Sequence, residues 1–247
     1  MGICEHANLS PVRLISNAEE IREMGRVALE RVVSYYESIA AGRPVVRPTT
    51  SSYLRGVFDE PLPREGSAFE DVLATLAETA VEFSRHSAHP RFFGYVSSPG
   101  TAVNAMGSMV AAALNINVTG WRSAPVGAEI ERLTIRWLGE MIGFPSDAGG
   151  LLVSGGSMAN FTGIAAARTA KASGDVVRDG VGSLRMTLYV SEEGHFSFRK
   201  AAAMLGLGTA SVRSVRTNAR QDMDLDDLAR GLREDRAAGH LPFCVVA

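Results

Sequence analysis

The strongest constraint on the fold is a turn of small residues within Leu151–Asn160, where the sequence reads LLVSGGSMAN. An apolar segment runs into serines and glycines, and helical periodicity begins directly after them. Such a turn exposes the free backbone N–H groups of a helix N-terminus, which favour an anion. Gly155 and Gly156 allow a close approach of the backbone, and Ser157 adds a hydroxyl donor. The turn therefore predicts either a phosphate site or a strand-to-helix connection in which glycine serves geometry alone.

Spacing argues against two other nucleotide motifs. A dinucleotide fingerprint needs G-x-G-x-x-G, whereas the next glycine after Gly156 is Gly163. A Walker loop needs Gly-Lys-Ser/Thr after its first glycine, and no such triplet follows here. The phosphate predicted at this turn is therefore not that of a Rossmann or P-loop nucleotide.

Composition limits the classes of partner. The 247 residues are 46% hydrophobic and 21% charged, as in an ordinary globular protein, with no apolar run long enough for a membrane span and no signal-peptide pattern. We therefore expect a cytoplasmic protein that does not bind membranes. A net charge of −2 gives no basic excess for nucleic acid. Cys4 and Cys244 lie at opposite ends, which predicts reduced thiols, and no metal site is expected.

The N-terminal third predicts two amphipathic helices joined by an extended arm. A capping box at Ser16–Glu19 opens the first helix, and a second box at Ser67–Glu70 opens the other. Residues 43–65 between them are rich in proline, threonine and serine and have no clean period, so we expect an extended arm. The apolar stripes of both helices need a partner, either the rest of the protein or a second subunit.

The middle of the chain predicts two further helices after an aromatic turn. Residues 101–117 are small and apolar, which indicates a closely packed helix, and Pro125 begins a stronger helix that Gly143 ends. The turn His89–Tyr95 either anchors the arm in a core or lines an aromatic substrate pocket.

From Leu151 onward, apolar segments alternate with helical ones. Strands are expected at residues 151–154, 184–191, 211–215 and 243–247, and helices near Ser157, His195 and Asp224. Short connections favour a parallel sheet, in which ligands bind at the carboxyl ends of the strands. The turns at 154–157 and 192–195 should therefore face one site. The last segment resembles a buried central strand, so we expect the amino-terminal portion of a longer protein.

His195 stands at the start of a predicted helix, directly after the second strand. A lone histidine there is commonly a cap or a packed ring. Beside a phosphate turn, however, an imidazole can stack on an aromatic cofactor and pass protons. Glu192 and Glu193 are interpreted as carboxylates that favour the helix dipole.

Taken together, five segments resemble the amino-terminal half of the group II pyridoxal-phosphate-dependent decarboxylases, the relatives of aromatic-L-amino-acid, tyrosine and histidine decarboxylase. These segments are His89–Tyr95, Trp121–Glu131, Ser154–Asn160 with its continuation to Arg168, Ser191–His195 and Leu241–Phe243. The resemblance covers nearly the whole chain. It implies an α/β fold, namely the mostly parallel, incomplete large domain of fold type I preceded by a helical amino-terminal arm.

The resemblance also implies roles for particular residues. Gly156 and Ser157 match the positions that hold the phosphate of pyridoxal 5'-phosphate, and His195 matches the catalytic histidine that stacks on its ring. The substrate-pocket residues are expected to be Tyr95, Val96, Ser97, Ser98 and, reaching the neighbouring subunit, Thr119. Family members are homodimers, which implies an arm and dimerisation segment at 1–92 and the amino-terminal part of the large domain at 93–247.

Some positions depart from the family pattern. Val96-Ser97 stands where aromatic decarboxylases carry Phe-Pro, and Thr119 stands where an aromatic residue is common. The resemblance implies that the family's cofactor lysine and the aspartate that pairs with the pyridinium nitrogen lie beyond residue 247. The only lysines of this chain are Lys171, on the polar side of one helix, and Lys200, expected more than one turn into the next. We therefore expect these residues alone to be inactive.

The resemblance and the departures from it allow three functions. The first is decarboxylation of an amino acid, aromatic or related, to the amine and carbon dioxide. The second keeps the cofactor but forms an aldehyde, or is another lyase reaction of the same family. The third is a non-catalytic fragment that dimerises.

Overall fold

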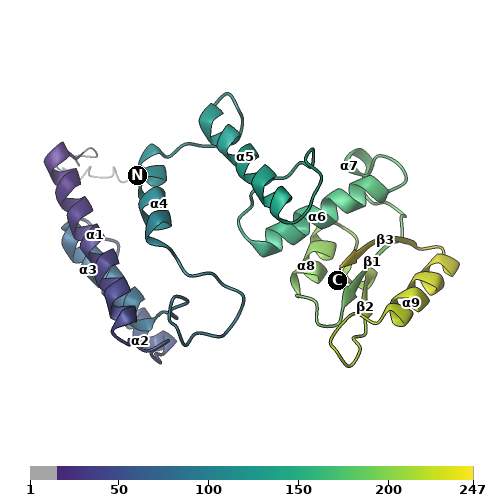
Figure 1. Ribbon diagram of the computed structural model, residues 1–247, viewed down its shortest axis with the longest axis horizontal. Helices are drawn as coiled ribbons and strands as arrows, with labels where there is room; N and C mark the ends of the chain where they lie inside the picture. The colour runs from purple at the N-terminus through teal and green to yellow at the C-terminus, as the bar shows by residue number, and fades with distance from the viewer. Residues whose placement is uncertain (1–15, 247) are drawn as a thin grey trace, which may run out of the picture. The chain divides into compact units, whose positions relative to one another are not determined.

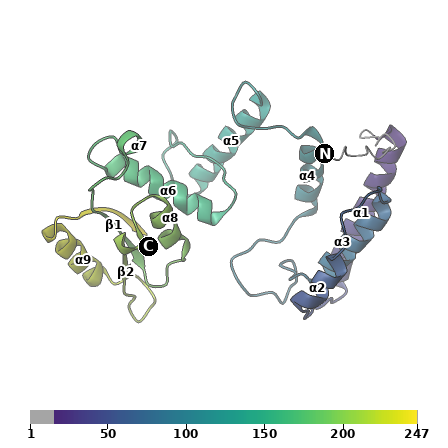
Figure 2. The ribbon, with the colours of Figure 1, turned by 180° about the vertical axis from the view of Figure 1, so that it is seen from behind.

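The structure, a computed structural model, describes residues 16–246. Its contacts divide the chain into two units, one ending at Asn115 and the other beginning at Ile116 (Figures 1 and 2). Each unit is described by itself below. Cys4 and Ala247 lie outside the described residues, and the functional division at residues 92 and 93 stays a prediction.

The first unit contains α1 (Ala18–Ala40), α2 (Ser51–Phe58), α3 (Phe69–Phe83) and α4 (Ala102–Leu114). Asn17 caps α1, because its Oδ1 accepts from the N–H of Glu20 at 2.9 Å while Glu20 Oε2 accepts from the N–H of Asn17 at 2.8 Å. The box predicted at Ser16–Glu19 is therefore wrong by one residue, since asparagine caps a helix as well as serine does.

The expected extended arm is wrong in its middle, where α2 forms. Thr50 caps this helix by accepting the N–H of Tyr53 at 3.2 Å, and the Tyr53 ring packs edge-on against Phe83, with centroids 5.4 Å apart. The second predicted capping box does not form. The N-cap of α3 is Ala68, without a side-chain cap, so the Ser67 hydroxyl lies one residue too early in the chain.

One ion pair joins α1 to α3. A second ion pair and a buried histidine join α3 and the residues that follow it to the start of the arm. Arg31 contacts Glu78 at 3.1 Å, and Arg43 contacts Glu82 at 3.3 Å. His86 is 3% exposed and donates its backbone N–H to Val45 at 2.9 Å. The two amphipathic helices therefore contact each other through charged side chains, while the apolar Val72 and Leu76 of α3 stay exposed within this unit.

The expectation of close packing for α4 is not met within its unit. None of its described residues is buried, and the apolar side chains of Val103 and Leu114 are 83% and 63% exposed. Thr101 and Asn115 cap its two ends, so local capping explains the helix without tertiary packing.

The second unit begins with α5 (Pro125–Met141), which starts at a proline as predicted. Then follow α6 (Gly156–Lys171), α7 (Val176–Asp179), β1 (Met186–Ser191), α8 (Ser197–Met204), a 3-10 turn (Thr209–Ser211), β2 (Val212–Val215), α9 (Leu225–Ala237) and β3 (Leu241–Val246). The strands form one parallel sheet in the order β2-β1-β3. The predicted alternation of strands and helices around a parallel sheet is thus confirmed.

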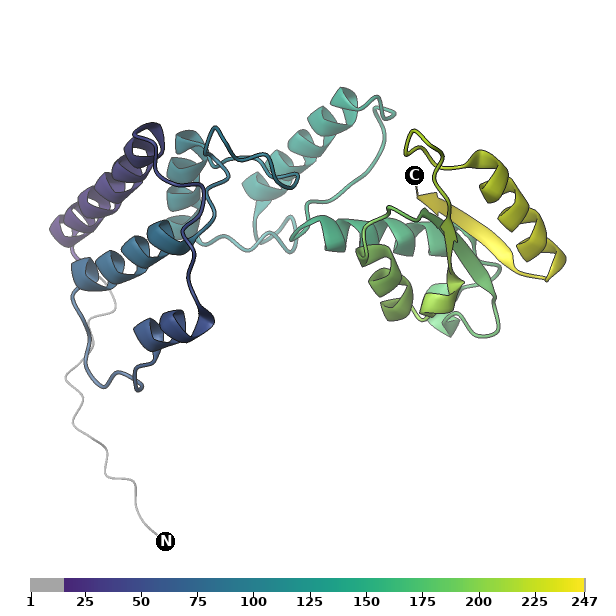
Figure 3. The same ribbon diagram turned by 90° about the horizontal axis from the view of Figure 1, so that it is seen from below.

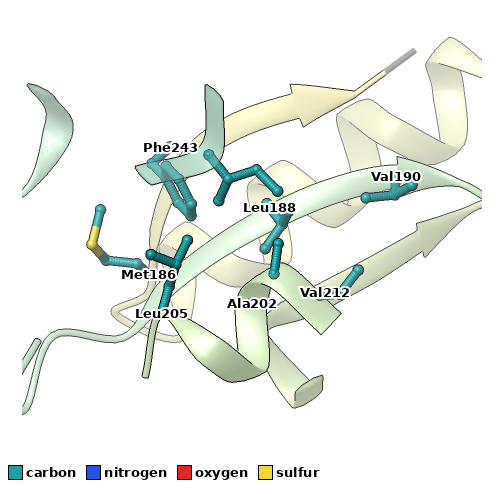
Figure 4. Packing of buried hydrophobic residues seen from close by; sticks show 9 residues of the cluster. Met186, Leu188, Val190, Ala202, Leu205, Val212 and Phe243 are labelled. Carbon is teal, nitrogen blue, oxygen red and sulfur yellow. The ribbon is translucent and has the colours of Figure 1, made fainter. Parts of the chain in front are cut away.

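The core lies between this sheet and two helices. Met186, Leu188 and Val190 alternate along β1 and pack in one cluster with residues of α6 and α8 (Figure 4). Tyr189 points to the other face, because its hydroxyl donates to Asp235 of α9. Helices α8 and α9 lie on different sides of the strands (Figure 3). The main cluster of buried residues is Ile164, Met186, Leu188, Val190, Ala201, Ala202, Leu205, Val212 and Phe243. β1 is the central strand of the described sheet, and its Leu188 side chain is completely buried.

Two strand predictions are corrected. Residues 151–154 form no strand, since no described strand pairs with them and the Leu152 N–H donates to the Glu131 carboxylate instead, at 3.0 Å. β3 was expected to be central and buried, but it is an edge of the described sheet, and Val245 is 47% exposed. In both cases apolar sequence indicated burial without identifying the neighbouring strand.

Candidate functional site

The small-residue turn forms the N-terminus of α6. Gly155 is the N-cap residue with φ +126°, ψ 172°, a conformation that only glycine adopts readily. Its carbonyl accepts the N–H groups of Met158 and Ala159, both at 3.0 Å, and no side chain caps the helix. Among the described residues, the N–H groups of Gly156 and Ser157 have no acceptor. The exposed turn thus presents two free amides and a hydroxyl, as an anion site requires.

His195 follows β1 on a tight turn. Gly194 donates its N–H to the Ser191 carbonyl at 2.8 Å, and a Cβ at Gly194 would lie 2.4 Å from Val190 Cγ1. Only glycine therefore fits this turn. The His195 side chain is exposed, and its ring lies 4.1 Å, centroid to centroid, from the ring of Phe196.

A buried serine joins His195 to the helix of the phosphate turn. Ser197, 2% exposed at the start of α8, has its Oγ 2.8 Å from His195 Nδ1. Asn160, one turn into α6, donates its Nδ2–H to the same Oγ at 2.9 Å. The structure thus brings the predicted turn and the predicted histidine together, and Ser197 and Asn160 are site residues that the sequence reasoning missed. Their spacing gave no signal, because the two residues meet only when α6 packs on α8.

Glu192 has a different role from the one predicted. It lies outside α8, which begins at Ser197. Its Oε1 accepts from the N–H and the hydroxyl of Thr217, at 2.6 and 2.8 Å, and these hydrogen bonds lower the pKa of Glu192. Because Thr217 follows β2, this carboxylate ties the His195 turn to the end of the neighbouring strand.

The aromatic turn of the first unit is partly structural. His89 is 4% exposed and its Nδ1 accepts the N–H of Arg91 at 3.0 Å, in agreement with the core interpretation. Tyr95 is 80% exposed with φ +62°, and the guanidinium of Arg85 lies 4.3 Å from its ring centroid. The exposed Tyr95 ring is therefore held by a cation and not by a core.

The predicted substrate-pocket residues are exposed and lie in different units. Tyr95, Val96, Ser97 and Ser98 belong to the first unit, and Thr119 belongs to the second. The pocket that they are expected to form stays a prediction.

The two lysines differ in their distance from the turn. Lys171 is the last residue of α6 and thus about 22 Å along the helix from Gly156. Lys200 lies within the first turn of α8, with its Nζ 4.6 Å from the centroid of the Phe196 ring. The expectation that Lys200 lies more than one helical turn from the start of its helix is therefore wrong, because α8 begins later than predicted.

Comparison with known proteins identifies the family. Residues 51–247 match the pyridoxal-dependent decarboxylase conserved domain. The chain belongs to this family. Membership confirms the resemblance carried by the five segments, together with the fold and the pyridoxal phosphate cofactor that it implies.

Similar proteins include decarboxylases and an aldehyde synthase. The aromatic-L-amino-acid decarboxylase of Bacillus atrophaeus is 32% identical to this chain, over 94% of this chain and 46% of the relative. The 4-hydroxyphenylacetaldehyde synthase of Rhodiola rosea is 26% identical over 92% of the chain and 47% of the relative. The crystal structure of Oryza sativa TDC with PLP and tryptamine superposes with a TM-score of 0.82 at 27% identity, covering 96% of this chain and 49% of that one.

The chain spans about half the length of the curated relatives it matches. No helix within residues 16–246 combines the length and apolar character needed to cross a membrane.

Proposed function

We propose that this chain carries the phosphate-binding turn and the ring histidine of a pyridoxal-phosphate-dependent decarboxylase, which converts an amino acid to its amine and carbon dioxide. One observation carries the proposal. The uncapped N-terminus of α6 is joined through Asn160 and Ser197 to His195, so an anion site and an imidazole belong to one hydrogen-bonded assembly.

The residues of the turn fit the cofactor phosphate. The N–H groups of Gly156 and Ser157 and the Ser157 hydroxyl would donate to it, and the positive end of the helix dipole favours its charge. An added Cβ at Gly155 or Gly156 would meet nothing within 4 Å, so the turn is open to a ligand. Among the residues of 16–246, no carboxylate caps the helix and competes with a phosphate.

His195 would stack on the cofactor ring and act as the catalytic histidine of this portion. Pyridoxal phosphate supplies, when bound, an aldehyde and an electron-accepting ring that permit loss of the α-carboxylate. The described residues bind and orient: the turn anchors the phosphate, and the imidazole offers a flat face and a ring nitrogen that can hold a proton.

Residues 1–247 by themselves are proposed to bind the cofactor without turnover. Lys171 lies at the far end of α6, and the ammonium of Lys200 rests on the Phe196 ring. Borohydride treatment with pyridoxal phosphate, followed by peptide mass mapping, tests this proposal. Specific labelling of either lysine would contradict it.

An aromatic amino acid is the proposed substrate class, supported by the name of the Bacillus atrophaeus relative. Tyr95, Val96, Ser97, Ser98 and Thr119 are proposed to line its pocket. The Rhodiola rosea relative favours a second candidate, aldehyde formation. Product analysis on a chain extended to the length of its relatives separates the two: amine and carbon dioxide support decarboxylation alone, whereas ammonia and peroxide support aldehyde formation.

We also propose a homodimer in the cytoplasm. The exposed apolar side chains on α4 and α5 support a second copy as partner, and the ordinary globular composition supports the location. Sedimentation of the chain and cell fractionation test these two statements. A monomer at micromolar concentration would contradict the first.

Phosphate recognition is tested by comparing pyridoxal phosphate with pyridoxal. Ser157→Ala should weaken binding of the phosphorylated form roughly ten- to hundredfold, the loss of one hydrogen bond to a charged group, and leave pyridoxal binding unchanged. Thr169→Ala, which removes an exposed hydroxyl from the same helix, is the matched control. Equal affinity of the wild-type chain for both ligands would refute the phosphate site.

A further inference from the structure

The two bonds at His195 Nδ1 define which ring nitrogen carries the proton. The backbone N–H of Ser197 donates to Nδ1 at 3.2 Å, and a backbone N–H can only donate. Nδ1 is therefore the unprotonated nitrogen of the neutral ring. The Ser197 Oγ, 2.8 Å from the same nitrogen, must then donate its hydrogen to it.

Asn160 explains why the Ser197 hydroxyl points this way. The Asn160 amide donates its Nδ2–H to Ser197 Oγ at 2.9 Å, so the oxygen accepts from Asn160 and gives its own hydrogen to His195. Ser197 is 2% exposed, so no bulk water competes for this hydroxyl. Both hydrogen bonds are therefore donated in the same direction: Asn160 of α6 donates to Ser197, and Ser197 donates to the imidazole.

The other ring nitrogen has no partner of its own. No described residue bonds His195 Nε2, while the imidazole itself is exposed. In the neutral ring the proton must reside on Nε2 when Nδ1 accepts two bonds.

We propose that Asn160 and Ser197 are positioning residues that hold His195 as the Nε2–H tautomer and so present a hydrogen-bond donor, not an acceptor, to the ligand of the site. The role of the Nε2–H toward a ligand rests on the proposed function, whereas the assignment of the His195 tautomer does not. Asn160 belongs to the helix that begins at the phosphate turn, so the same element that would anchor the phosphate also orients the imidazole proton.

The test measures the nitrogen-15 chemical shifts of the histidine rings in the chain without added cofactor. His195→Gln assigns the His195 signals among the five histidines. In alkaline buffer, where imidazole is neutral, the wild-type chain should show an unprotonated Nδ1 and a protonated Nε2 with widely separated shifts. A protonated Nδ1, or two shifts averaged to similar values, overturns the proposal.

Asn160→Asp reverses the relay without changing the shape of the side chain. A carboxylate can only accept, so it should take the Ser197 hydroxyl hydrogen and leave Oγ as an acceptor for His195. Proton occupancy should then shift toward Nδ1, and the separation of the two nitrogen shifts should shrink. Ser197→Ala removes the hydroxyl donor but keeps the backbone N–H donor at Nδ1, so it should shrink the separation less than Asn160→Asp does, and Thr169→Ala should not change it. If the two His195 nitrogen shifts are separated in both Asn160→Asp and Ser197→Ala as widely as in the wild-type chain, the proposal is overturned.

Cofactor titration separates this proposal from the proposed function. If pyridoxal phosphate fails to bind while the tautomer responds as expected, the relay stands and the cofactor assignment falls. If the cofactor binds but the nitrogen shifts of the variants match those of the wild-type chain, the relay falls alone.

Discussion

Replacing Asp235 by asparagine should remove a pH-dependent part of the stability of the second unit. Asp235 is 8% exposed and joins α9 to the face of the sheet opposite the main core. Its Oδ2 accepts the Tyr189 hydroxyl at 2.5 Å, and its two oxygens accept from Arg213 Nη2 and Nε at 2.7 and 2.9 Å. Asparagine keeps the shape but turns one acceptor into a donor that faces the guanidinium.

The magnitude follows from the pKa of the carboxyl group. The hydrogen bond from Arg213 is the largest cause that lowers the pKa of Asp235 from 3.8 to about 2. A depression of this size corresponds to about 2 kcal/mol of stability at neutral pH, and solvent around the partly exposed Arg213 reduces it to about 1–2 kcal/mol. Because the folded pKa is depressed, this stability is present above pH 3.8 and is lost as the pH falls through about 2.

Urea unfolding of the chain at pH 7 and near pH 3 measures the effect. Asp235→Asn should be less stable than wild type by about 1–2 kcal/mol at pH 7, and the difference should fall by about half near pH 3. Asp179→Asn, in the exposed pair with Arg178, is the control and should change nothing measurable. A difference that is the same at both pH values would refute the assignment of the stability to the ionised carboxyl group.

Three further predictions concern single positions. Gly155→Ala should lower the unfolding free energy by about 1–3 kcal/mol because φ is +126°, whereas Gly156→Ala, with ordinary helical backbone, should not; thermal melts of both variants compare them directly. Leu188→Ala should cost about 2–5 kcal/mol in urea unfolding, since the side chain is fully buried, and a loss below 1 kcal/mol would show that the core cluster is wrongly placed. Burial raises the pKa of the Cys244 thiol, so its reaction with a disulfide reagent at pH 8 should be slower than in urea, and equal rates would contradict the burial.

Local signals in the sequence were enough to predict much of the second unit. Pro125 starts α5, Asp224 caps α9, and the alternation of apolar segments gave β1, β2 and β3 within a few residues. These features depend on neighbours in the chain, so a single sequence contains them. The roles of Gly156, Ser157 and His195 came from the family resemblance. Their common location was predicted from a strand at 151–154 that does not form, and the bonds of Asn160 and His195 to Ser197 bring the two turns together instead.

Other features depend on contacts between distant residues. Asn160 meets Ser197 only because α6 packs on α8, and Glu192 meets Thr217 only because β1 and β2 are neighbours. Residues 151–154 have the composition of a strand but no strand partner among the described residues. The α2 helix had a readable signal in Thr50 and Tyr53, but the surrounding prolines outweighed it.

The contact between Lys200 and Phe196 allows NMR spectroscopy of the labelled Lys200 amine to report on the surroundings of His195. With only two lysines in the sequence, reductive methylation with carbon-13 formaldehyde introduces few labels besides the terminal amine. The Lys200 methyl groups would lie over the Phe196 ring, whose ring current shifts their resonances upfield, and the Phe196 ring lies 4.1 Å from the His195 ring. Any ligand that moves the imidazole would change this shift, so the chain contains a built-in spectroscopic reporter of occupancy that requires no substitution.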